Sequence, residues 1–217
     1  MYSRKNFCDF ASVLLLIFVI LIYFSGCEKF SSPTAPKQED INRAGFIETS
    51  AGQKVQVLTF GDVKPSLRKV HKTEKWIQKD EGGNLELKFK VENSDDGELE
   101  VEIELKIHEN SIPQDCKMAM QLDDEKFLSN LDVIFGPHDL QFSKAADLNI
   151  KIRLENMYLN GINQDDINVY YFNEEAGYWE EMDCEEILIE VNGGVIEKIE
   201  VINAKLPHFS RYALCKG

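Results

Sequence analysis

Two runs near the middle of the chain alternate strictly between apolar and polar residues. In the first run, every second residue from Leu85 to Val91 is apolar, and the residues between are charged. In the second, the apolar positions run from Leu99 to Ile107 and alternate mainly with glutamates. A period of two buries one face of a strand and leaves the other in water. Because the turn Asn93–Gly97 joins the runs, we predict an antiparallel hairpin with an acidic, solvated outer face.

Shorter β-like runs follow this hairpin as far as the C-terminus. Turn signals separate them, among them Gly136-Pro137, Asn160-Gly161 and Asn192-Gly193, and no long amphipathic helix pattern interrupts them. Their number and spacing predict an all-β fold, an antiparallel β-sandwich of two sheets packed face to face. We expect strands at residues 117–122, 131–135, 147–154, 167–172, 178–182, 187–191, 195–202 and 211–215.

The region before the hairpin divides into two segments of different composition. Residues 27–50 contain Pro33 and Pro36 among Ser, Thr and charged residues, with few apolar positions, so we expect a flexible linker. Residues 51–82 contain short β-like runs whose period is blurred by Pro65 and by a lysine-rich stretch. We interpret this segment as an ambiguous, β-rich lead-in to a main domain at residues 83–217.

The N-terminus has the pattern of an export signal. Two basic residues precede an apolar stretch from Phe10 to Phe24, which has the length of a signal-peptide core and is short for a membrane span. Two small residues then precede Cys27, as in the lipobox of bacterial lipoproteins. We therefore predict a signal peptide at residues 1–26 and a lipid on Cys27 that anchors the chain to a bacterial membrane. In the alternative, the leader stays uncleaved as a signal anchor. Both place the folded part in the cell envelope, facing the periplasm or the exterior.

The chain is strongly acidic. Its 217 residues include 24 basic and 38 acidic side chains, which gives a formal net charge of −14. This charge repels phosphate backbones, so we expect no nucleic-acid partner. The sequence contains no phosphate-binding loop, zinc-protease helix motif or nucleophile elbow, and we predict no cofactor.

Three cysteines fall in the predicted domain, namely Cys116, Cys184 and Cys215. An oxidising compartment permits one disulfide among them and leaves one thiol over, with the pairing open. No pair has the C-x-x-C spacing of a zinc site. The alternative, which we favour for at least one of them, is a small buried hydrophobic residue in a strand.

Three segments of the C-terminal half resemble a known family. Residues Phe135–Ile152, Val169–Met182 and Leu206–Leu214 read FGPHDLQFSKAADLNIKI, VYYFNEEAGYWEEM and LPHFSRYAL. In this order they resemble a bacterial version of the ZU-five domain, which ankyrins, netrin receptors and zonula occludens proteins share. The resemblance covers roughly residues 83–215 and implies a β-sandwich that binds protein partners without a cofactor. Where the family has a Pro-Gly-Ala-Leu turn, this chain has His108–Pro113, so we expect its early strands to connect differently.

The last of these segments contains the tripeptide His208–Phe209–Ser210. In certain death-domain relatives of the family, the same tripeptide cleaves itself between Phe and Ser. Ser210 would attack the Phe209 carbonyl, His208 would move the proton, and backbone strain would drive the conversion of amide to ester before hydrolysis. The alternative, which we favour, is structural: Phe209 packs the final strand and Ser210 bonds to the backbone.

Two further sets of residues have a binding interpretation. Tyr170, Tyr171, Tyr178 and Trp179 could form a sugar-stacking platform, whereas strand alternation places one face of their hairpin in the core, which we favour. Acidic clusters at residues 123–125, 165–166 and 180–186 offer oxygen ligands to Ca²⁺, but none has EF-hand spacing. We interpret them as solvated and predict no metal site.

These observations predict a membrane-anchored envelope lipoprotein that acts as a non-enzymatic protein-interaction or structural module. Its expected partner, besides the membrane, is an envelope protein or a glycan. The alternatives are an autoproteolytic domain that cleaves between Phe209 and Ser210 and a glycan-binding module.

Overall fold

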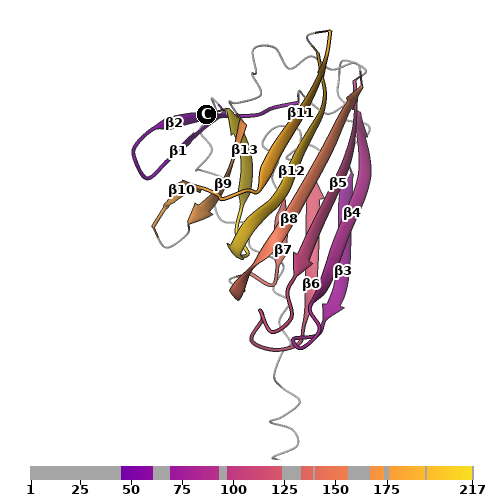
Figure 1. The fold of residues 1–217 in the computed structure, drawn as a ribbon, viewed down its shortest axis with the longest axis vertical. Helices are drawn as coiled ribbons and strands as arrows, with labels where there is room; N and C mark the ends of the chain where they lie inside the picture. The colour runs from indigo at the N-terminus through magenta and orange to yellow at the C-terminus, as the bar shows by residue number, and fades with distance from the viewer. Residues whose placement is uncertain are drawn as a thin grey trace, which may run out of the picture. The chain divides into compact units, whose positions relative to one another are not determined.

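All regular structure in the described part of the chain is β-strand. The computed structural model describes residues 45–60, 69–92, 97–123, 133–138, 140–155, 167–173, 176–193 and 195–216, which belong to one compact unit, Lys37–Gly217. The strands pair antiparallel in three sheets (Figure 1). These sheets pack on one another, so the predicted all-β sandwich is confirmed.

The three sheets differ in size and in how they combine distant parts of the sequence. The first sheet has the order β1 (Phe46–Glu48), β2 (Lys54–Val57), β13 (Tyr212–Lys216), β9 (Ile167–Asn173) and β10 (Tyr178–Glu181). The second has the order β11 (Glu186–Asn192), β12 (Val195–His208), β8 (Gln141–Glu155), β5 (Glu98–Ile107) and β4 (Gly83–Glu92). The third has the order β3 (Val70–Ile77), β6 (Cys116–Asp123) and β7 (Ile134–Gly136).

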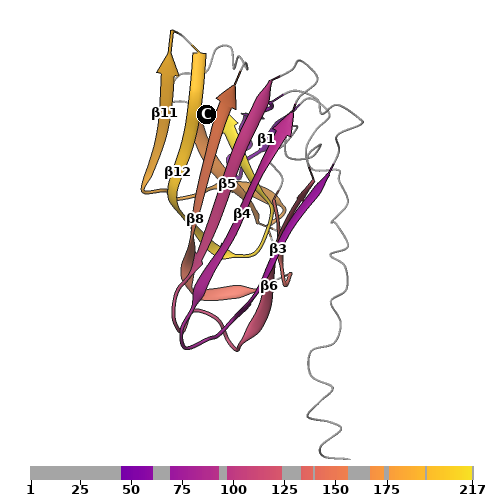
Figure 2. The ribbon, with the colours of Figure 1, turned by 90° about the vertical axis from the view of Figure 1, so that its right-hand side faces the viewer.

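The second sheet is the central layer. Figures 1 and 2 show its five strands side by side, with the first sheet facing its upper part and the third sheet its lower part. Apolar side chains from all three sheets form one core cluster, and a smaller cluster lies on the other face of the first sheet. As a result, β13 is buried on both faces.

The hairpin predicted from the alternating runs is confirmed. β4 and β5 pair along their whole length, from Gly83–Ile107 to Glu92–Glu98. The apolar residues of both strands are buried, while the charged residues between them are exposed or half-buried. Burying a large aliphatic side chain is worth about 1.5–3 kcal/mol, so the inward face of this hairpin is a main source of stability.

The glutamates of β5 are balanced by basic residues of the strands on either side, β8 and β4. Nη1 of Arg153 on β8 lies 2.9 Å from Oε2 of Glu100, and Nζ of Lys88 on β4 lies 2.7 Å from Oε1 of Glu102. Exposed pairs of this kind contribute only about 0–1 kcal/mol each, but they offset repulsion among the glutamates of β5. One row across the sheet alternates in sign, with the order Glu200, Lys151, Glu102 and Lys88.

The structure corrects the predicted boundaries before residue 83. β1 lies within the predicted linker at residues 27–50, and its Ile47 is buried in the smaller cluster. Residues 51–82 are not a separate lead-in, because β2 pairs with β13 and β3 pairs with β6. Three residues of β1 are too few to show a period, and β3 mixes polar and apolar residues on both faces. The predicted signal peptide, Cys27 and the linker as far as residue 44 lie outside the described residues.

Two strands are longer than predicted. β8 begins at Gln141, and β12 continues to His208. The register of these two strands shifts between Val201 and Ala204, where Asn203 has a left-handed φ of 51° and its N–H donates to Oδ1 of Asn149 at 2.8 Å. Two residues of β12 oppose one residue of β8 here, and the extra residue breaks the period of two. This break conceals the second half of β12 in the sequence.

Candidate functional site

The tripeptide His208–Phe209–Ser210 lies at the corner where the chain passes from the second sheet to the first. His208 ends β12, and Tyr212 begins β13. The hydroxyl of Ser210 is buried and donates to the Phe172 carbonyl at 2.5 Å. Tyr212 Oη donates to the His208 carbonyl at 2.5 Å. Both side-chain hydrogen bonds therefore fix the backbone of this corner.

Phe209 fills the core below this corner. Its ring is 2% exposed, stacks on Phe135 at 5.3 Å between centroids and meets Phe142 edge-on at 5.1 Å. The N–H of Phe209 also donates to the Leu140 carbonyl at 3.0 Å. Aromatic pairs of this geometry add about 0.5–1.5 kcal/mol each to the burial of their surface. These contacts are those of the packing role that we favoured from the sequence.

The ring of His208 faces the first sheet. It lies edge-on to Tyr171 with 5.4 Å between centroids, and the hydroxyl of Tyr171 donates to Glu180. The other carboxylate oxygen of Glu180 accepts from Nδ2 of Asn173 at 2.8 Å. Burial and the hydrogen bond to Glu180 raise the pKa of Tyr171 to about 12. The hydrogen bonds from Tyr171 and Asn173 lower the pKa of Glu180, which stays ionised.

Self-cleavage needs a base at the serine hydroxyl and a strained scissile bond. The imidazole and the hydroxyl each have another contact, since the His208 ring lies edge-on to Tyr171 and the Ser210 hydroxyl donates to the Phe172 carbonyl. Among the described non-glycine residues, left-handed φ values occur at Asn110 and Asn203. The contacts of the tripeptide thus support the packing role.

The proposed sugar-stacking platform is wrong for two of its four aromatic residues. Trp179 and Tyr170 are 2% and 5% exposed and belong to the smaller cluster of the first sheet. The guanidinium of Arg211 lies 4.5 Å from the ring centroid of Phe172 and 5.9 Å from that of Trp179. The core interpretation therefore holds for Trp179 and Tyr170. The buried Trp179 Nε1 has no hydrogen-bond partner.

The acidic clusters are dispersed in the structure. Glu180 is engaged by Tyr171 and Asn173, and Glu185 accepts from Nδ2 of Asn203 at 2.6 Å. No group of three or more His, Cys, Asp or Glu side chains in the described residues is arranged to hold a metal ion. Residues 124–125 and 165–166 lie outside the described part of the chain.

No disulfide joins any two of the three cysteines in the described residues, and Cys184 and Cys215 are free thiols. Cys215 is fully buried in β13, and burial raises the pKa of its thiol, so the interpretation as a small hydrophobic residue is confirmed there. Burial, with a smaller contribution from Asp183 and Glu181, raises the pKa of Cys184 to about 11. Neither thiol is activated as a nucleophile.

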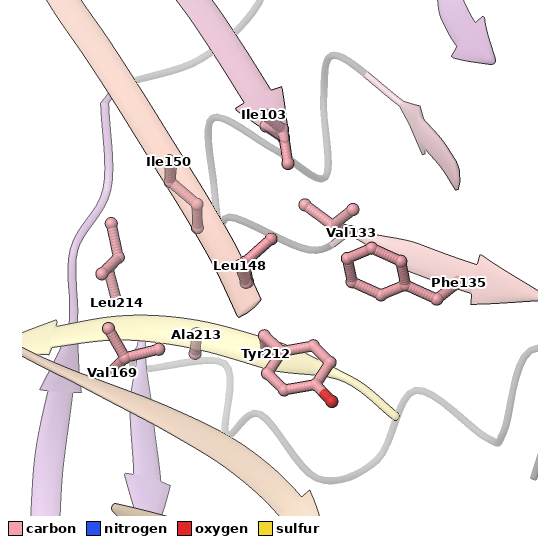
Figure 3. Close-up of a pocket in the computed structure, with 9 residues that line it drawn as sticks. All are labelled: Ile103, Val133, Phe135, Leu148, Ile150, Val169, Tyr212, Ala213 and Leu214. Atoms are coloured by element: carbon pink, nitrogen blue, oxygen red, sulfur yellow. The ribbon is translucent and has the colours of Figure 1, made fainter. Parts of the chain in front are cut away.

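A small cavity lies near the corner, between the sheets. Figure 3 shows its lining, with Leu148 and Ile150 from the second sheet, Phe135 from the third, and Val169 and Tyr212 from the first. Its volume of about 10 Å³ is room for a single water at most, and its walls are apolar. It is a packing void of the core, too small for a substrate.

One polar cluster was not predicted from the sequence. Asp147 of β8 is buried, with its Oδ1 2.6 Å from Nζ of Lys205 and its Oδ2 3.0 Å from Nε2 of His108. Burial alone would raise the pKa of Asp147, but the hydrogen bond and charge of Lys205, with smaller effects of His108 and Lys106, outweigh it and lower this pKa. The three residues are distant in sequence, and only the strand register brings them together.

The comparisons with known proteins find no similar protein. No family model matches the chain, no curated protein matches it, and no solved structure matches its fold. The described residues include no apolar helix of bilayer-spanning length.

Proposed function

We propose that this chain is a lipid-anchored protein of a bacterial cell envelope whose β-sandwich acts as a non-enzymatic interaction module. The observation that carries the anchor is the order of basic start, apolar stretch and small residues before Cys27. Acyl chains contribute about 0.8 kcal/mol per buried methylene and anchor a protein stably once there is more than one chain. The partner in this proposal is an envelope protein or a glycan.

The contacts around the corner support an interaction module over a self-processing domain. His208, Phe209 and Ser210 each have a structural contact, to Tyr171, Phe135 and Phe172 respectively. The outer face of the second sheet spans five strands and carries exposed charged residues that are paired across strands. Such a polar, ordered face suits a partner that recognises charge more than apolar area.

Metabolic labelling with radioactive palmitate in a bacterial host tests the anchor. We expect label in the wild-type chain and in Cys8→Ser, and loss of label in Cys27→Ser. Cys8 is the matched control because it is the cysteine that lies within the predicted signal peptide, before Cys27. An unlabelled, full-length chain in the membrane would overturn the lipid anchor in favour of an uncleaved signal anchor. An unlabelled, full-length chain in the cytosol would overturn the whole proposal.

We also infer that the sandwich is a divergent ZU-five-like domain. The three segments that carry the resemblance coincide with β7 to β8, with β9 to β10, and with the end of β12 to β13. An experimental structure superposed on family members tests this inference. A shared strand order through these segments is expected, and a different order would remove the family assignment while leaving the anchor untouched.

A further inference from the structure

Strand β3 exposes two large apolar side chains. Val70 is 58% exposed and Trp76 is 61% exposed. Thr73 pairs with the fully buried Met120 of β6, and strand side chains alternate between faces. Residues at even positions of β3, among them Val70 and Trp76, therefore point away from the core.

Two lysines share this outward side. Lys72 lies between Val70 and Trp76 on the strand, and Lys117 of β6 is paired in register with Trp76. We call Val70, Lys72, Trp76 and Lys117 the β3 face. Both lysines pair with Glu74, yet their side chains remain 42% and 50% exposed.

The outward side of β3 is electrically balanced on an anionic chain. Lys72 and Lys117 pair there with Glu74, and Asp123 lies on the same side because it pairs in register with Val70. Two lysines thus stand against two carboxylates, whereas the whole chain has a formal net charge of −14. The lysines lower the pKa of Glu74, which stays ionised and keeps both pairs formed. An anionic surface would therefore be repelled less by this strand than by the acidic remainder of the chain.

We propose that the β3 face docks on the phosphate headgroups of the bilayer to which Cys27 anchors the chain, an inference that rests on the proposed lipid anchor. Tryptophan is amphipathic and sits at the headgroup level, and lysines attract anionic lipids. Val70 and Trp76 are about 20 Å apart along the strand, with Lys72 between them. Separate apolar side chains among charged residues suit an interfacial layer, whereas a protein interface has its apolar residues together at one contiguous centre.

The length of the tether allows this contact. Eighteen residues run from Glu28 to Gly45, which reach at most about 60 Å when extended. The longest strand, β8, has 15 residues and is about 50 Å long. Any face of the sandwich can therefore turn to the bilayer. The charge and the apolar side chains of each face decide which face binds. Because tethering raises the effective concentration to about the millimolar range, even a weak contact is populated.

Tryptophan fluorescence tests the docking, because the chain has only two tryptophans. The acylated protein is purified from bacterial membranes and reconstituted in vesicles of phosphatidylethanolamine and phosphatidylglycerol whose acyl chains are brominated near the headgroup. We expect bromine to quench the emission of the wild type and of Trp179→Phe. We expect this quenching to be lost in Trp76→Phe, because the remaining Trp179 is buried in the smaller apolar cluster of the first sheet.

A charge variant and its matched control complete the experiment. Lys72→Gln is expected to lower the ratio of docked to undocked protein about fivefold. Lys88→Gln, at an exposed lysine on the outer face of the second sheet, is expected to leave the ratio unchanged. Flotation of the same vesicles reports the anchor separately. A chain that floats with Trp76 unquenched in these vesicles, which contain no other protein, overturns the docking alone. A chain that does not float overturns the tether and the docking together.

Discussion

Replacement of Asp147 by asparagine removes one buried negative charge and little volume. The carboxylate contacts Nζ of Lys205 at 2.6 Å and Nε2 of His108 at 3.0 Å. Hydrogen bonds to charged partners contribute about 1.5–3 kcal/mol, and asparagine keeps a neutral acceptor at the same place. We therefore expect Asp147→Asn to lower the free energy of unfolding by about 2 kcal/mol at neutral pH, roughly a thirtyfold change in the folded-to-unfolded ratio.

The same variant has a defined pH dependence. The pKa of Asp147 is lower in the folded chain than in the unfolded chain, where it is about 3.9. The advantage of the wild type is therefore complete above that unfolded value and is lost as the pH falls through the lowered folded value. The two chains should converge in stability in strong acid, even though both become less stable there.

Denaturant unfolding at neutral and at acidic pH measures both effects. The emission of the buried Trp179 reports the transition. Glu100→Gln is the control, because Glu100 and Arg153 are both about half exposed and their pair should contribute less than about 1 kcal/mol. Equal stability of Asp147→Asn and wild type at neutral pH, or a difference that persists undiminished in acid, would refute the account of this cluster.

Four further predictions concern the corner and the last strand. Phe209→Ala empties an aromatic position beside Phe135 and is expected to lower the free energy of unfolding by about 3–5 kcal/mol in denaturant titrations. Ser210→Ala removes the hydrogen bond to the Phe172 carbonyl and should lower it by about 1–3 kcal/mol. Denaturing mass spectrometry should find the wild type and Ser210→Ala equally unbroken at this site after prolonged incubation, and a wild-type fragment that begins at Ser210 would restore self-cleavage. Iodoacetamide should alkylate Cys215 only after denaturation, because the thiol is buried and its pKa is raised, and labelling of the native protein would contradict this.

The alternating runs were sufficient to predict the centre of the fold. From Leu85 to Val91 and from Leu99 to Ile107 the period of two is unbroken, and these strands are paired over their full length. Such strands have one solvated and one buried face, so the alternation of residues predicts them directly. β3 shows no such alternation, because it lies at the end of its sheet and mixes polar and apolar residues on both faces.

The polar cluster could not be predicted for a different reason. His108, Asp147 and Lys205 are each ordinary polar residues of strands or strand ends, and nothing near them in sequence marks them. Asp147 is buried because β8 lies between β5 and β12. Its neighbours in register on these strands are Lys106 and Lys205. The pairing of β8 with two other strands, which a single sequence leaves open, decides both the burial and the pKa.

The corner at His208–Ser210 shows how packing alone can account for a match in residue types. A chain that leaves one sheet for another must fix its backbone to both, and here Phe209 N–H bonds to Leu140 while the Ser210 hydroxyl bonds to Phe172. A large aromatic ring between them fills the space that opens where two sheets diverge. These needs alone call for an aromatic residue followed by a small hydroxyl residue. Self-cleavage would also need the imidazole at the serine hydroxyl, and the edge-on contact of the His208 ring with Tyr171 is one that packing alone explains.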